Sequence, residues 1–330
     1  MTKPRVAFMG TGEIGLPVLR WLRQAPSVEL VALVTQPDRP VGRSQVLTPP
    51  GPKKEVSGSG VRVFQPERLR RSPAVDELRQ LRPDLIVVMA YGQILPKAVL
   101  ELPSLACLNL HASLLPKHRG AAPIQAALLA GDRETGITVM HMAESLDTGD
   151  IVLEKKFRIR RRDTGADVHD RLADLAPVAL AEALELLLAG KAPRVPQVEE
   201  EATYAAKLDR DSGRIDWQQD CWCLDRLVRA MYSWPGAYTE IQLPGDGNGP
   251  RRLKVQRALP VHRRKGSPGT VLGVSPRGIL VACGAGALLL KQVQLEGKRQ
   301  LPAAEFARGI RLQAGQLLGP QPGEPDQKNG

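Results

Sequence analysis

The chain has 330 residues, 42% of them hydrophobic, which is enough for about two globular domains with cores of normal size. No apolar run approaches the roughly 20 residues that cross a bilayer, and the first residues resemble neither a signal peptide nor a transit segment. The formal net charge of +11 suggests a polyanionic partner, with nucleic acid the first choice, although a solvated basic surface would give the same count.

The first half of the chain alternates between short apolar runs and segments of helix length. The apolar runs cover residues 5–9, 30–35, 85–90, 107–111 and 136–142. Continuous apolar strands alternating with helices are typical of a sheet covered on both faces. We therefore predict an α/β domain over residues 1–189, with a doubly wound, mostly parallel sheet. Residues 164–190 have the pattern of a long helix, which Pro177 should kink or split.

The second half of the chain differs in composition and in the spacing of its apolar runs. Residues 190–206 are rich in Pro and charge and are predicted to be a linker. Residues 207–320 contain short strand-like runs separated by turn signals, which predict a small β-barrel. This region has 18 Lys and Arg against 9 Asp and Glu, so it carries +9 of the total charge. The tail at 321–330 is predicted to be disordered.

The four cysteines do not form a metal or redox motif. Only Cys221 and Cys223 are close, and their spacing matches neither a zinc knuckle nor a CxxC pair. We therefore expect reduced packing cysteines in a cytoplasmic protein.

The segment GTGEIG at 10–15 satisfies the GxGxxG pattern, directly after a predicted strand and before a predicted helix. The acidic residue expected after the second strand is missing, because Gln36 and Pro37 follow it and Asp38 lies beyond reach of a ribose. The pattern therefore favours a tight turn over a dinucleotide site. An NAD(P)-dependent oxidoreductase is the alternative that rests on this motif alone.

Three polar residues could form a site. Asn109 and His111 are two residues apart near the end of a predicted strand, so their side chains leave the same face. Asp147 lies in a polar turn between two strand-like runs. Together they could supply an amide donor, an acid and a base; the alternative is that all three only stabilise turns. No Ser or Cys is placed as a nucleophile, so the attacking group would come from a substrate.

Several longer segments carry a family resemblance. They are LNLHASLLPKHRGAAPIQAALLAGDRETGITVMHMAESLDTGDIV (108–152), TQPDRPVGR (35–43), YGQILP (91–96), YAAKLDRDSGRIDW (204–217), RLVRAMYSWPGAYT (226–239) and GKRQLPAAEFARGIRLQAGQLLG (297–319). The chain resembles the formyltransferases that use 10-formyltetrahydrofolate, and its C-terminal segments are similar to those of members that act on initiator methionyl-tRNA. The resemblance implies formyl transfer to the amino group of that tRNA, a folate co-substrate, no metal, and an OB-like C-terminal barrel. We expect a monomer with no membrane partner.

The resemblance also implies roles for individual residues. Asn109, His111 and Asp147 would be catalytic. The folate site would consist of Met89, Tyr91, Gly92, Ile94, Leu95, Pro96, Ser113, Leu114, Leu115 and Pro116. The loop at 36–54 would contact tRNA through Arg39, Arg43, Lys53 and Lys54, although relatives have Gly-Lys-Lys where this chain has Ser44, Gln45 and Val46. The charge of the barrel predicts a second tRNA contact, at the cluster of Arg251, Arg252, Lys254 and Arg257.

Two other functions remain open at this point. A formyltransferase that acts on a small amine, such as glycinamide ribonucleotide or an amino sugar, would share the trio but would not need a basic barrel. A tRNA-binding protein without catalytic activity would not need the trio.

Overall fold

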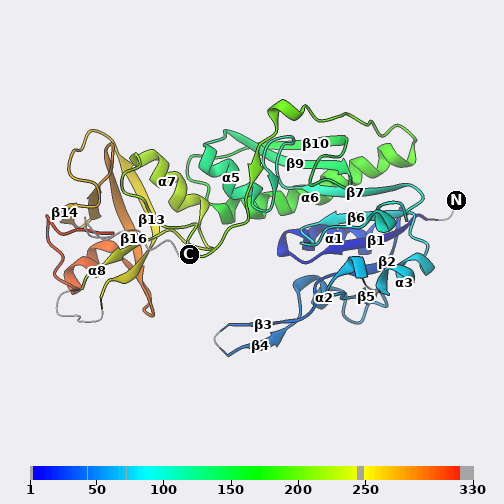
Figure 1. Cartoon of the computed structure of the whole chain (residues 1–330), viewed down its shortest axis with the longest axis horizontal. Helices are drawn as coiled ribbons and strands as arrows, with labels where there is room; N and C mark the ends of the chain where they lie inside the picture. Colours follow the sequence, from blue (N-terminus) through cyan, green and yellow to red (C-terminus); the bar gives the residue numbers. More distant parts are fainter. Residues whose placement is uncertain (1–2, 43, 72, 244–248, 320–330) are drawn as a thin grey trace. The chain divides into compact units, whose positions relative to one another are not determined.

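The computed structural model describes residues 3–42, 44–71, 73–243 and 249–319, and they form two compact units (Figure 1). Unit 1 comprises residues up to 124, 133–159 and 167–206. Unit 2 comprises residues 125–132, 160–166 and the described residues from 207 on. The domain boundaries taken from the sequence stay a prediction. The expected disordered tail at 321–330 lies outside the described residues.

Unit 1 is built on a seven-stranded sheet. In spatial order the strands are β10 (Ile151–Arg158), β9 (Glu134–His141), β7 (Ala106–His111), β6 (Leu85–Met89), β1 (Arg5–Gly10), β2 (Glu29–Val34) and β5 (Arg62–Phe64). The five strands from β7 to β5 are parallel. The other two, β9 and β10, pair antiparallel at one edge, so the predicted mostly parallel α/β fold is confirmed. The chain order reverses between β1 and β6, the kind of position at which open α/β sheets bind ligands.

Both faces of this sheet are covered. Residues 6–9 of β1 are all fully buried, which explains why the strand is a continuous apolar run instead of an alternating one. One face packs on residues of α3 (Ala74–Gln80) and α4 (Lys97–Leu100). The buried side chains of α6 (Gly165–Leu188) recur at helical spacing, and Pro177 lies within this helix without splitting it, contrary to one outcome expected from the sequence.

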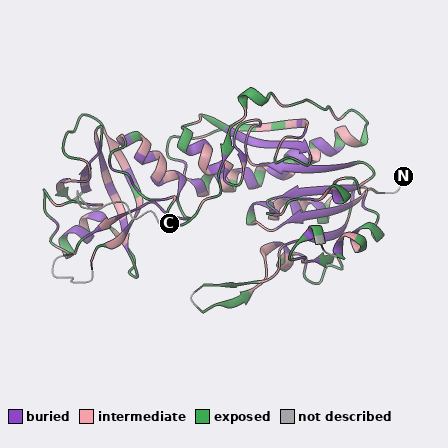
Figure 2. Cartoon of the chain, in the orientation of Figure 1, coloured by how far each residue is buried: buried purple, intermediate pink, exposed green. Residues whose placement is uncertain are grey.

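The remaining elements of unit 1 are short. Its other helices are η1 (Glu13–Gly15), α1 (Leu16–Gln24), α2 (Gly51–Glu55), η2 (Leu69–Arg71) and η3 (Glu199–Glu201). Helix α5 (Pro123–Ala130) begins in unit 1, but most of its residues belong to unit 2. A separate hairpin pairs β3 (Arg39–Val41) with β4 (Val46–Thr48) and extends away from the main sheet (Figure 1). Its exposed surface contrasts with the buried central strands in Figure 2. A two-stranded sheet pairs β8 (Arg119–Gly120) with β11 (Tyr204–Ala205).

Unit 2 is built on an antiparallel sheet. Its strands are β12 (Tyr238–Ile241), β13 (Arg251–Val261), β16 (Ala287–Leu295), β15 (Gly278–Ala282) and β14 (Val271–Ser275) in spatial order, with β17 (Gln300–Pro302) paired to β16. The segment at 316–319 hydrogen-bonds to both edge strands, β12 and β14, which closes the sheet. Helices α7 (Cys221–Ala230) and α8 (Ala303–Gly309) contribute to the same core. The predicted C-terminal β domain is therefore confirmed, and the structure shows that its strands pair antiparallel. No helix in the described ranges combines the length and apolar character that crossing a membrane requires.

Candidate active site

Strand β7 presents the first two residues of the site. Asn109 and His111 leave the same face of the strand, as their spacing predicted, and their exposed fractions are only 8% and 6%. Buried polar side chains are costly unless they find partners, so the contacts of these two residues decide what the site can do.

Asp147 reaches both residues from the loop between β9 and β10. Its Oδ1 lies 3.4 Å from Nδ2 of Asn109, and its Oδ2 lies 3.6 Å from Nδ1 of His111. The backbone N–H of Gly120 donates to the same Oδ2 at 2.8 Å. The structure thus brings the three polar side chains together from positions 38 residues apart in the chain. Their catalytic role stays a prediction.

The second nitrogen of His111 is also engaged. Nε2 lies 2.9 Å from the carbonyl oxygen of His118, which can only accept, so Nε2 carries the proton. Nδ1 faces the carboxylate of Asp147, so each ring nitrogen of His111 lies opposite an oxygen atom. The contact at Nδ1 is longer than a hydrogen bond, so Nδ1 is the ring nitrogen that remains available to a substrate.

The turn after β7 is held by internal hydrogen bonds. The Ser113 hydroxyl donates to the carbonyl of Lys117 at 2.6 Å. The Thr138 hydroxyl donates to the carbonyl of Ser113 at 2.7 Å and accepts from the N–H of Leu115 at 3.1 Å. Ser113 is fully buried, so its hydroxyl shapes the turn and does not face solvent. Leu115 is buried as well, whereas Leu114 and Pro116 are partly exposed.

The predicted folate residues after β6 divide into a buried and an exposed set. Met89, Tyr91 and Leu95 are at most 4% exposed, whereas Gly92 is exposed and Ile94 is 69% exposed. Pro96 is partly exposed. The Tyr91 side chain packs in the core of unit 1, and burial raises its pKa to about 12. Its hydroxyl has no hydrogen-bond partner among the described residues.

The GTGEIG segment forms a tight turn. The N–H groups of Thr11 and Gly12 both donate to the carbonyl of Ala90, at 3.1 and 3.2 Å, so neither is available to a pyrophosphate. A Cβ on Gly10 would lie 2.6 Å from a ring atom of Phe8, so the first glycine is explained by packing. Gly12 has a φ of −72°, which any residue can adopt, and a Cβ there would lie 3.1 Å from that of Ala90.

The predicted tRNA residues of the hairpin region have different surroundings. Arg39 and Lys54 are exposed, whereas Lys53 is ion-paired with Asp38 at 2.8 Å. That lysine and Gln65 lower the pKa of Asp38 through hydrogen bonds. The charge of Lys53 is thus already balanced within unit 1. Arg43 lies outside the described residues.

The basic residues of β13 in unit 2 are also partly engaged. Arg252 and Lys254 alternate with the buried Leu253 and Val255, so both leave the outer face of the strand. Arg252 pairs with Asp211 at 3.1 Å, and Lys254 donates to the carbonyl of Pro235 at 3.3 Å. Arg251 donates to the carbonyl of Glu296 at 2.9 Å, and Arg257 is exposed.

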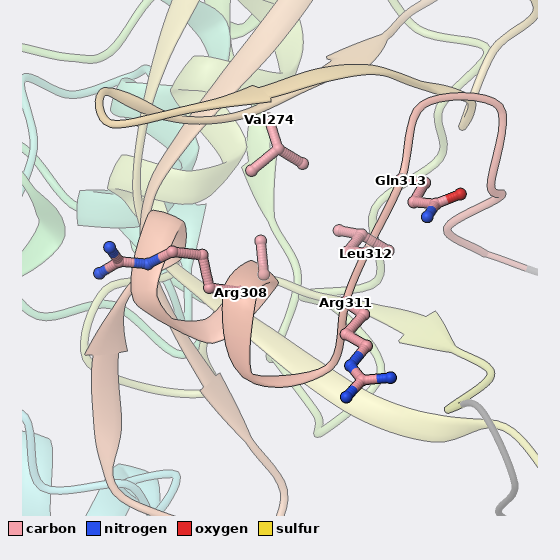
Figure 3. A pocket seen from close by; sticks show the side chains of 6 residues that line it. Val274, Arg308, Arg311, Leu312 and Gln313 are labelled. Carbon is pink, nitrogen blue, oxygen red and sulfur yellow. The ribbon is translucent and has the colours of Figure 1, made fainter.

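Unit 2 has a hollow of about 340 Å³ between β14 and the end of α8. It is lined by Val274, Ala307, Arg308, Arg311, Leu312 and Gln313. The guanidinium groups of Arg308 and Arg311 point away from one another (Figure 3), so they do not converge on one anion. This hollow contains none of the residues predicted from the sequence.

The residues that sequence reasoning missed support the trio. Gln197, Arg119 and Thr203 contact the loops that carry it, although two of them lie in the segment predicted to be a linker. That segment has no periodicity from which the contacts could be predicted. Within the described ranges, no group of three or more His, Cys, Asp or Glu side chains is arranged to hold a metal ion.

Two domain families match this chain. The family described as formyl transferase matches residues 4–184, and the family described as formyl transferase, C-terminal domain matches residues 207–311. Among similar proteins, the methionyl-tRNA formyltransferase of Methylacidiphilum infernorum is 45% identical over 96% of this chain and 98% of its own length. That of Pseudomonas fluorescens is 46% identical over 95% of this chain and 98% of its own.

Solved structures share the fold at low sequence identity. The sugar 3N-formyl transferase WlaRD, solved in the presence of dTDP and 5-N-formyl-THF, has a TM-score of 0.63 at 13% identity and covers 91% of this chain and all of its own. HypX from Aquifex aeolicus, in complex with tetrahydrofolic acid, has a TM-score of 0.58 at 21% identity and covers 94% of this chain and 48% of its own.

Proposed function

The chain belongs to the formyltransferase family, and we propose that it transfers the formyl group of 10-formyltetrahydrofolate to the amino group of initiator methionyl-tRNA. The similarity to methionyl-tRNA formyltransferases over nearly the whole length, C-terminal domain included, is the observation that carries this proposal. A folate-derived donor is also supported by the family and by a structural neighbour with bound tetrahydrofolic acid.

The trio suits direct formyl transfer. The free amine of methionyl-tRNA attacks the formyl carbon, and the formyl oxygen becomes an oxyanion. Asn109 has a second amide hydrogen that can donate to this oxygen, and Nδ1 of His111 can donate as well. Asp147, which lies 3.6 Å from Nδ1, orients His111 and takes the proton that the amine loses. The bond to the folate nitrogen then breaks, and that nitrogen gains the proton that Asp147 took from the amine, so no covalent enzyme intermediate is needed.

The distances support this assignment of roles. The contacts of Asp147 with Asn109 and His111, at 3.4 and 3.6 Å, are longer than ideal hydrogen bonds, as is common before a substrate binds. His111 stays anchored through Nε2 while Nδ1 turns toward the oxyanion.

The folate is proposed to bind beside the trio. The segment from Met89 to Pro96 begins at the last residue of β6, next to the position where the strand order reverses. The exposed Ile94 offers apolar surface to a flat pterin, and the turn at 113–116 begins two residues after His111.

The tRNA is proposed to contact basic residues in both units. Arg39, Arg43 and Lys54 would serve near the acceptor end, together with Lys53 if its pairing with Asp38 exchanges for a phosphate. Arg251, Arg252, Lys254 and Arg257 would contact the sugar–phosphate backbone.

A direct comparison of acceptors tests the function. The protein is supplied with 10-formyltetrahydrofolate and either initiator methionyl-tRNA or glycinamide ribonucleotide. We expect formyl transfer to the tRNA alone. Preferential formylation of the small amine would overturn the proposal in favour of a small-molecule formyltransferase.

A further inference from the structure

The segment at 195–205 is hydrogen-bonded to the loops around the trio. Val195 pairs with Ile151, at the start of β10. The Thr203 hydroxyl accepts from the N–H of His118 at 2.9 Å, and His118 is the residue whose carbonyl anchors His111. Strand β11 pairs with β8, which ends at the N–H that donates to Asp147. The segment therefore touches the supporting groups of two members of the trio.

Gln197 makes the most direct of these contacts. Its Nε2 donates to the carbonyl of Asp147 at 2.9 Å and to that of Gly149 at 2.8 Å. Its Oε1 accepts from Nε and Nη2 of Arg119, at 3.1 and 2.9 Å. Both amide hydrogens and the amide oxygen are thus in use, which fixes the side chain in one orientation.

Arg119 holds Gln197 from the opposite side. Only 1% of its surface is exposed, and its Nη1 is ion-paired with Glu199 at 2.8 Å. A buried guanidinium needs its full set of partners, so this arginine resists displacement. It also directly precedes Gly120, whose N–H donates to Asp147.

The backbone of Asp147 needs such support. Its φ is +54°, a left-handed conformation that residues other than glycine adopt at a cost and that the surrounding structure must maintain. Gln197 holds the carbonyl of this residue, and Gly120 holds its carboxylate. Both ends of Asp147 are therefore attached to one connected network of hydrogen bonds.

We propose that Gln197 is a positioning residue for formyl transfer, which acts by holding the Asp147 loop in its left-handed conformation. This inference rests on the proposed function and on the role of Asp147 in it. Gln197 does not touch the reacting atoms. Its loss lets the carboxylate move relative to Asn109 and His111, and displacements of about 1 Å in a catalytic geometry typically cost roughly a hundredfold in rate.

Two substitutions at Gln197 test this role. Gln197→Met keeps the length of the side chain and loses all four hydrogen bonds. Gln197→Glu has the same shape and keeps the acceptor for Arg119 but loses both donors to the loop. We expect kcat to fall about tenfold to a hundredfold in both variants. KM for the formyl donor and Kd for methionyl-tRNA should stay within about twofold, because the lost contacts act on geometry and not on binding.

The control is Glu200→Gln, at an exposed position of the same segment, which should retain the kcat of the unmodified protein. A Gln197→Glu protein with unmodified kcat would overturn the proposal. So would a parallel loss of kcat and of tRNA affinity, which would indicate a general structural role. If Gln197→Met does not fold, the isosteric Gln197→Glu decides alone.

The same experiment separates this inference from the function on which it rests. An unmodified protein that does not formylate methionyl-tRNA overturns the proposed function and the positioning role with it. An active unmodified protein whose Gln197 variants are equally active overturns the positioning role alone. An Asp147→Asn protein run in parallel must lose activity, since otherwise Gln197 has no catalytic group to position.

Discussion

Replacing Asp147 by Asn removes the charge of the trio while keeping the shape of the side chain. In the structure both carboxylate oxygens accept, one from the N–H of Gly120 and the other from the amide of Asn109. An amide has only one acceptor oxygen, so either orientation of the new side chain places an NH₂ group against another donor. The charge that faces His111 is lost as well.

The geometry sets the size of the effect. For two unit charges 3.6 Å apart, the attraction is roughly 4.6 kcal/mol at an effective dielectric constant of about 20. Solvent screens little of it, because the two side chains are only 6% and 10% exposed. If the imidazolium acts in the transition state, kcat should fall about three orders of magnitude, since each 1.36 kcal/mol or so is a factor of ten.

Single-turnover formyl transfer to methionyl-tRNA measures this loss, and tetrahydrofolate binding shows whether the variant stays folded. The matched control is Asp150→Asn, a carboxylate three positions along the same chain that faces Arg194 at 3.6 Å. It should leave kcat within about twofold, because exposed ion pairs contribute little. An Asp147→Asn protein with a kcat within about threefold of the control would refute the assigned role of the carboxylate.

Four further outcomes follow from the same contacts. Asn109→Ala should lower kcat about 100- to 1,000-fold in the single-turnover assay, since an oxyanion donor is lost; an unchanged kcat would exclude that role. Arg257→Glu should weaken binding of all tRNAs and reduce the slope of log Kd against log salt by about 1 to 2, measured by filter binding. An unchanged slope would remove this arginine from the interface. Tyr91→Phe should maintain or raise Tm, because it deletes a buried hydroxyl without a partner among the described residues. Burial raises the pKa of Tyr91 from 10.0 to about 12, so this residue makes the free energy of unfolding fall as the pH rises through that interval. Tyr91→Phe should remove this contribution, and an unchanged dependence of the free energy of unfolding on pH would contradict the burial of the hydroxyl. Gly10→Ala should lower the free energy of unfolding by about 1 to 3 kcal/mol in a denaturant titration, and Gly12→Ala by less, because the first Cβ has far less room; the reverse order would contradict the packing of this turn.

Short-range patterns determined much of this protein. The apolar run at 107–111 predicted a buried strand, and the two-residue spacing of Asn109 and His111 placed both side chains on one face. This prediction was possible because side chains along a strand alternate between its two faces, so the spacing in the sequence decides which residues share a face. The short strand-like runs and turn signals after residue 205 predicted a separate β domain for a similar reason, since turn residues and strand lengths are local features.

Long-range pairing was decided only by the tertiary structure. The apolar run that became β9 gave no sign that it would pair antiparallel with β7, because a buried strand has the same pattern in either direction. The ion pair of Lys53 with Asp38 likewise depends on which segments meet. The same holds for the two N–H groups of GTGEIG that donate to the carbonyl of Ala90.

Gln197 shows this limit most clearly. It lies 50 residues from Asp147 and 78 from Arg119, in a segment rich in Pro and charge that has no periodicity. Its side chain has no local signal, because its partners are backbone carbonyls and a guanidinium contributed by distant loops. The sequence could therefore identify the groups suited to the chemistry, whereas the contacts that hold them in place exist only once the chain has folded.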